Sequence, residues 1–301
     1  MSAEDDSRAG FLTRLRLEEA GVDRWYGRVA GSRAEQIPRG LLAAQGTMAA
    51  GRTVDTRWSW VHSVHVTHLA EGDPVADVEY RVERLRDTEH TANRLVRAMQ
   101  GQTALAVVTV AFQTPRRGFG PNHQEEWSSE PPDPHSLPAV SFEAGIVPLL
   151  DVRYIDRAPW EPLAGPEAAN RMWIRFTEEL PDEILPHSAA IVFATESLPV
   201  EPVAPRSGEW TDLESGRGLH AVALDLSVRF HRSFRADDWV VHEHRSPSSA
   251  DYRALSTGRF FSSMGRLVAS VSQETALLPV ADPVEHKEVA QQAGTSSGAG
   301  R

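Results

Sequence analysis

The sequence predicts an α+β protein made of two similar halves, each an antiparallel sheet wrapped around a central helix. Segments in which apolar and polar residues alternate, with many β-branched side chains, indicate strands. Two segments rich in small apolar residues indicate helices, because small side chains let a curved sheet approach the helix backbone. The strand segments follow each helix in the same order, which favours a duplicated fold.

The first helical segment runs from Gln36 to about Gly51 and has Pro38 near its start, where proline suits a helix. The second covers His187 to about Ser197 and is rich in alanine. The expected strands are 77–84, 93–99 and 104–112 in the first half, and 221–230, 239–244, 252–262 and 266–273 in the second.

The ends of the two halves share a residue pattern. Two arginines eight residues apart are followed by a glycine, an apolar strand and a glutamine in both halves. These residues are Arg86, Arg94, Gly101 and Gln113 in the first half, and Arg245, Arg253, Gly265 and Gln273 in the second. Matches in the same order support the duplication.

Two segments lie outside the expected cores. The segment from Pro115 to Pro138 contains several prolines and glycines, so it reads as a linker that crosses a surface. The chain ends in a small polar segment, Ala293–Arg301, that is typical of disorder. We therefore expect an N-terminal unit at 8–114, a Pro-rich linker at 115–144, a C-terminal unit at 145–280 and a disordered tail at 281–301.

Composition excludes several classes of protein. Without cysteine there is no disulfide framework, thiolate metal site or cysteine nucleophile. A net charge of −11 argues against a nucleic-acid partner, which needs an excess of basic side chains. The acidic start of the chain does not fit a secretory signal, and the apolar runs are too short to span a bilayer. We expect a cytoplasmic protein with no membrane partner.

Several motifs then resemble one family. Val82–Asp87, Ala98–Gln100 and Ala111–Gln113 resemble the first half of the acyl-CoA thioesterase II family, the double-hotdog hydrolases. In the second half Met172–Arg175, Phe230–Phe234 and Leu267–Glu274 resemble the same family. The resemblance implies a double hotdog fold and the hydrolysis of fatty acyl-CoA thioesters to free acid and CoA. It implies acyl-CoA as the substrate, with no metal and no cofactor.

The family attacks the thioester with a water held by an acidic residue, a hydroxyl residue and a glutamine. The resemblance assigns the glutamine to Gln273 and the acid, which acts as general base, to Glu196. A different alignment of this segment puts Ala194 in the place of the acid. The hydroxyl position is Ala223, so Thr195 or Ser197 would have to supply a hydroxyl.

Histidines and arginines supply further candidates. His65 matches a family position in the first half. Arg229 and Arg232 belong, with His231 and Arg235, to a basic cluster suited to the phosphates of CoA. The alternative for this cluster is ion pairing with Asp237 and Asp238. We expect His65, Arg229 and Arg232 to bind substrate.

His62, His65 and His68 form a series that could suggest a metal site. On a strand, however, only His62 and His68 should share a face, so we expect no metal here.

Two other functions remain open. The missing hydroxyl at Ala223 makes a non-catalytic acyl-CoA-binding or scaffold protein the main alternative. A hotdog hydratase or dehydratase is disfavoured, because the motifs of those enzymes are absent from both helices. Open sheet edges favour a homo-oligomer.

Overall fold

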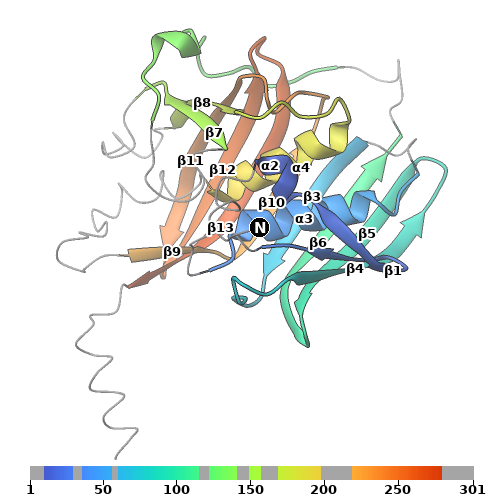
Figure 1. The fold of residues 1–301 in the computed structure, drawn as a ribbon. Helices are drawn as coiled ribbons and strands as arrows, with labels where there is room; N and C mark the ends of the chain where they lie inside the picture. Colours follow the sequence, from blue (N-terminus) through green and yellow to red (C-terminus); the bar gives the residue numbers. More distant parts are fainter. Residues whose placement is uncertain are drawn as a thin grey trace, which may run out of the picture.

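The structure is a computed structural model that describes residues 10–29, 36–55, 60–114, 122–140, 149–156, 169–197 and 219–279 (Figure 1). The first half contains α2 (Phe11–Arg14), β1 (Leu17–Gly21), β2 (Arg24–Gly27), α3 (Arg39–Gly51), β3 (Trp60–His68), β4 (Val78–Asp87), β5 (Thr91–Gln100) and β6 (Thr103–Gln113). The short helix η2 (Pro134–Ser136) follows. The second half contains β7 (Leu150–Tyr154), β8 (Asn170–Phe176), α4 (Ile184–Ser197), β9 (Leu219–Ala223), β10 (Asp225–Phe230), β11 (Val240–Ala250), β12 (Arg253–Ser262) and β13 (Leu267–Pro279).

The strands of the described residues form one sheet, and the strand order shows the duplication. The first half runs β1-β2-β4-β5-β6-β3 and the second runs β7-β8-β11-β12-β13-β10. Strands at the same position in the two orders are equivalent, so that β3, for example, corresponds to β10. The second half has one additional strand, β9, which pairs with β13. The halves join where β3 pairs with β10, for example at His65 and Ser227. This arrangement confirms the predicted α+β double hotdog.

The two long helices pack against each other on one face of the sheet, which we call the inner face (Figure 1). Small residues in α3 permit this packing. A Cβ at Gly40 would lie 2.7 Å from the carbonyl oxygen of Phe193 in α4, and a Cβ at Gly46 would lie 2.9 Å from Val108 of β6. The start of α3 therefore lies against the end of α4.

Replacing Gly40 with valine should force α3 and α4 apart, because the obstructing atom is backbone and cannot rotate away. Overpacking of this kind costs about 1–3 kcal/mol. We expect the free energy of unfolding in urea to fall by about 2 kcal/mol. An unchanged urea midpoint would contradict the close helix contact.

The structure corrects several expected boundaries. The second helix begins at Ile184 rather than His187, and Pro186 lies in its first turn, where an amide hydrogen has no helical acceptor. The expected single strand at 221–230 is two strands, β9 and β10, which separate at Leu224. Strands β1, β2, β7 and β8 were not expected, since each has only four to seven residues.

The described part of the linker, residues 122–140, contacts the second half. Gln124 hydrogen bonds to Gly265 and Leu267, and the indole of Trp173 donates to the carbonyl of Pro132 at 2.8 Å. The remaining linker residues and the tail at 281–301 lie outside the described residues. The unit boundaries at 8–114 and 145–280 stay predictions.

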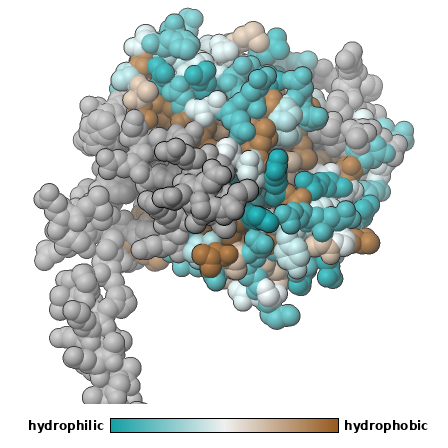
Figure 2. All heavy atoms as spheres, in the orientation of Figure 1, coloured by the Kyte–Doolittle hydropathy of each residue, from teal (hydrophilic) through white to brown (hydrophobic). Residues whose placement is uncertain are grey.

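On the face visible in Figure 2, the described residues are mainly hydrophilic, and hydrophobic residues form scattered patches outside the atoms drawn in grey. Among the described helices, none combines the length and apolar character that a membrane crossing requires.

Candidate functional site

The structure brings together the two residues expected to carry the chemistry. Glu196 lies in the last turn of α4, and Gln273 lies within β13 on the inner face. The side-chain amide of Gln273 donates a hydrogen bond to Glu196 Oε2 at 3.1 Å. Gln113, which shares its sequence context with Gln273, is instead exposed at the end of β6. The similarity of the two glutamines therefore does not extend to their surroundings.

A third residue completes this cluster, and it comes from the first half. His68, the last residue of β3, lies 2.8 Å from Glu196, between imidazole Nε2 and carboxylate Oε1. The side chains of His68 and Glu196 are 1% and 0% exposed. Both oxygens of a fully buried carboxylate are thus held by side chains from two strands.

Two buried polar atoms of the cluster have no hydrogen-bond partner among the described residues. They are His68 Nδ1 and Gln273 Oε1. Buried polar groups are usually satisfied by protein or by ordered water. The cluster thus leaves two atoms that can bind a small polar molecule.

Backbone geometry explains why these residues meet. Val64, Val66 and His68 alternate along β3 and point to the inner face, where the two valines are buried in the core. The His68 amide donates to the carbonyl of Leu224 at 3.0 Å, which fixes the end of β3 beside the junction of β9 and β10. On the helix side, Gly40 allows close approach, since its Cβ would lie 3.1 Å from Glu196 Cβ.

No hydroxyl takes the expected place at Ala223. Ala223 pairs with Thr275 between β9 and β13. The hydroxyl of Thr195, one expected substitute, donates to the Ile191 carbonyl at 2.7 Å within its own helix. The side chain of Ser197, the other substitute, lies outside the described residues.

The expected substrate-binding residues lie on the opposite, outer face of the sheet or at its edge. His65 is on the outer face of β3, and its Nδ1 lies 2.9 Å from Ser227 Oγ. Burial, and then the charge of Arg229, lower the pKa of His65. Arg229 is exposed on β10, and Arg232 donates to the Leu267 carbonyl at 2.8 Å. His65, Arg229 and Arg232 therefore lie away from Glu196, and their role in substrate binding stays a prediction.

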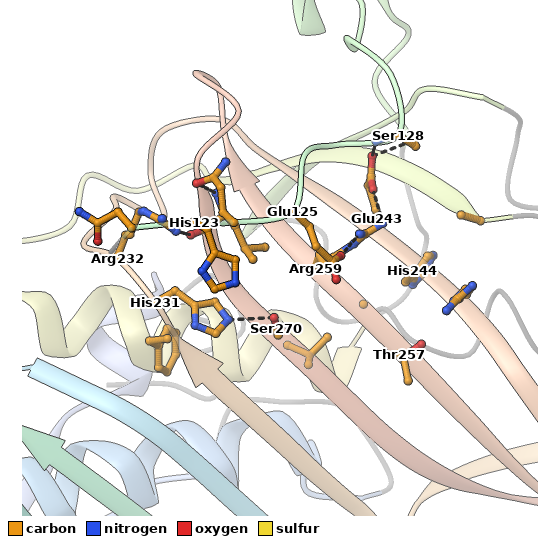
Figure 3. Close-up of a pocket in the computed structure, with 18 of the residues that line it drawn as sticks. His123, Glu125, Ser128, His231, Arg232, Glu243, His244, Thr257, Arg259 and Ser270 are labelled. Atoms are coloured by element: carbon orange, nitrogen blue, oxygen red, sulfur yellow. Dashed lines mark hydrogen bonds and ion pairs between the residues drawn. The ribbon is translucent and has the colours of Figure 1, made fainter. Parts of the chain in front are cut away.

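A cavity of about 1150 Å³ lies on this outer face, between the sheet and the linker residues 122–128 (Figure 3). Its charged side chains largely satisfy one another. Arg259 pairs with Glu125 and Glu243, and Glu243 also accepts from Ser128 at 2.9 Å. The alternative role of the basic cluster, ion pairing with Asp237, is realised by Arg235 at 2.7 Å.

The histidine series does not form a metal site. A β-bulge at His62 interrupts the alternation of β3, so the expectation that His62 and His68 share a face does not hold across it. His65 and His68 lie on opposite faces. Within the described ranges, no three histidine, aspartate or glutamate side chains are grouped as metal ligands.

His242 of β11 is a second buried histidine on the inner face. Its ring stacks on Phe260 with centroids 4.1 Å apart, and burial lowers its pKa to about 3. In the unfolded chain the pKa is about 6.5, so folding favours the neutral ring. This stabilisation is complete above the unfolded pKa and is lost as the pH falls towards the folded pKa.

The wild-type protein should therefore lose about 2 kcal/mol more stability than His242→Leu when the pH falls from 7.5 to 5. Urea unfolding of both proteins at the two pH values measures the difference. His90→Leu, at a half-exposed hairpin position, is the control. Equal losses for wild type and His242→Leu would show that His242 does not titrate with unfolding.

His68 is the residue that sequence reasoning did not place in the site. The signal was present, because Val64, Val66 and His68 alternate on one side of an apolar strand. What the sequence does not reveal is that this end of β3 lies beside the end of α4.

Comparisons with known proteins agree with this fold. Residues 40–113 match the acyl-CoA thioesterase N-terminal domain, and residues 121–277 match the C-terminal domain. Acyl-CoA thioesterase 2 of Haemophilus influenzae is 25% identical over 79% of this chain and 86% of its own length. Human acyl-coenzyme A thioesterase 8 is 25% identical over 89% of each chain.

Solved structures show the same relationship. The acyl-CoA thioesterase II TesB2 of Mycobacterium marinum is 32% identical over 88% of this chain and 96% of its own, with a TM-score of 0.71. The tesB protein of Mycobacterium avium subs paratuberculosis is 27% identical over 92% and 100%, with a TM-score of 0.76. The chain therefore belongs to the acyl-CoA thioesterase family and is a thioester hydrolase.

Proposed function

We propose that this enzyme hydrolyses fatty acyl-CoA thioesters with a water activated by Glu196 and oriented by Gln273. The observation that carries the proposal is the hydrogen bond between these two side chains in a buried cluster. A carboxylate held in this way supplies the negative charge that makes water nucleophilic. Activation of this type accelerates a reaction by about 10²–10⁴-fold.

Hydrolysis requires attack of water on the thioester carbonyl carbon and departure of the CoA sulfur. The water oxygen forms a bond to the thioester carbonyl carbon, and the carbon–sulfur bond then breaks. The proton removed from water goes to the CoA sulfur. The start of α3, which lies against Glu196, offers backbone amides with no helical acceptor, and such donors stabilise a developing oxyanion.

Thiol release from purified protein tests the proposal. A panel of acyl-CoAs from acetyl to long-chain is incubated with the protein, and free CoA is measured with a thiol reagent. We expect release far above the spontaneous rate for at least one chain length. Saturable acyl-CoA binding without thiol release would instead support the alternative, a non-catalytic acyl-CoA-binding protein.

We also propose that the protein acts in the cytoplasm and as a homo-oligomer. The strands β1 and β7 are the two edges of the sheet in the described residues, and sheet edges are where a second copy can pair. Light scattering of the purified protein distinguishes a monomer from an oligomer.

A further inference from the structure

We infer that Glu196 activates the attacking water through His68, whose Nδ1 accepts the proton. This inference rests on the proposed function and assigns the proton a route within the same site. It makes His68, supplied by the first half, a catalytic residue.

The hydrogen bonds around Glu196 set the protonation of the ring. A carboxylate only accepts hydrogen bonds, so the 2.8 Å contact at Oε1 requires the proton on His68 Nε2. In the neutral ring Nδ1 is then a bare acceptor. The Gln273 amide nitrogen donates to Oε2, so Gln273 Oε1 is likewise an acceptor. The two atoms that lack a partner among the described residues, His68 Nδ1 and Gln273 Oε1, are therefore both hydrogen-bond acceptors.

A water molecule fits this pair because it has two hydrogens to donate. One hydrogen bonds to His68 Nδ1 and the other to Gln273 Oε1, which leaves an oxygen lone pair for the thioester carbon. Of the two acceptors only the imidazole is basic, since an amide oxygen does not take up a proton near neutral pH. Water therefore loses its proton to Nδ1.

The proton taken up by His68 is returned to the leaving group later in the reaction. As the carbon–oxygen bond forms, His68 becomes an imidazolium whose charge the buried Glu196 carboxylate stabilises across the Nε2 hydrogen bond. When the carbon–sulfur bond breaks, the imidazolium returns the proton to the CoA sulfur. The products are the acid and CoA, and both side chains regain their starting states.

His68→Gln tests this role, because glutamine can place an amide donor near Glu196 but provides no base. We expect kcat to fall by about 10²–10⁴-fold with KM changed by less than about threefold. His90→Gln, which replaces a half-exposed histidine outside the Glu196 cluster, should keep wild-type kcat. A kcat for His68→Gln within about threefold of wild type would overturn the inference, since His68 would then only hold Glu196.

Thiol release by the wild type and by the two variants distinguishes failure of the proposed function from failure of the role of His68. If the wild-type enzyme releases no thiol, the proposed function itself fails. If wild type is active, and Glu196→Gln is inactive but His68→Gln is not, only the role of His68 fails. Should His68→Gln not fold, a high-resolution crystal structure of the wild type decides. A water within hydrogen-bond distance of both His68 Nδ1 and Gln273 Oε1 is expected, and a site without it would overturn the inference.

Discussion

Replacing Glu196 with glutamine is expected to lower kcat for acyl-CoA hydrolysis by about 10³–10⁴-fold. The amide is nearly isosteric but carries no charge. If the NH2 group of the amide faced His68 Nε2, the ring would no longer be held in the tautomer with its proton on Nε2. If the amide oxygen faced Nε2, its neutral charge would not stabilise an imidazolium. Steady-state thiol release, with enzyme in excess where turnover is slow, measures the loss.

Glu89→Gln is the matched control, because the Glu89 side chain is 87% exposed in the hairpin between β4 and β5. Its kcat should equal that of the wild type. Binding of a non-hydrolysable acyl-CoA to Glu196→Gln should stay close to wild type, since the change removes a charge from the reacting centre and leaves the fold intact. Retained hydrolysis by Glu196→Gln would remove this carboxylate from the mechanism.

The second large effect is on stability, at Arg94. This arginine lies on the inner face of β5 and is only 2% exposed. Its guanidinium donates to the Thr53 hydroxyl at 2.7 Å, to Asp87 at 2.7 Å and to the Asn93 carbonyl at 2.9 Å. It thereby ties the chain after α3 to the hairpin of β4 and β5.

Arg94→Met keeps the aliphatic stem but removes the donor from all three acceptors, of which Thr53 is buried. Hydrogen bonds that involve a charged group contribute about 1.5–3 kcal/mol each, so we expect the free energy of unfolding to fall by about 3 kcal/mol. Arg97→Met on the same strand is the control, since the Arg97–Glu83 pair is about half exposed and worth less than about 1 kcal/mol. Equal urea midpoints for the two variants would contradict this account.

Local patterns in the sequence predict much of this fold. Long alternating strands such as β5 and β6 have enough residues for periodicity to emerge, and the small residues of α3 indicate close packing. Short strands such as β2 give little periodic signal. The break at Leu224 arises from tertiary pairing, because β9 joins only β13 while β10 lies between β3 and β13.

The candidate site was likewise predictable from the sequence only in part. Gln273 and Glu196 can be proposed from a resemblance in sequence, and the structure brings them within hydrogen-bond distance. His68 lies 128 residues before Glu196. The pairing of β3 with β10 and the packing of α3 on α4 together bring the first half to the end of α4. The placement of His65 and Arg229 on the outer face depends on the same pairing, which the sequence alone does not specify.

A crystal structure with a ketone analogue of acyl-CoA, in which a methylene replaces the thioester sulfur, tests the central claim most directly. We predict that the ketone carbon lies about 3–3.5 Å from a water bound between His68 and Gln273, with the carbonyl near the start of α3. Binding of the ketone in the outer cavity beside Arg232, away from Glu196, would contradict the account.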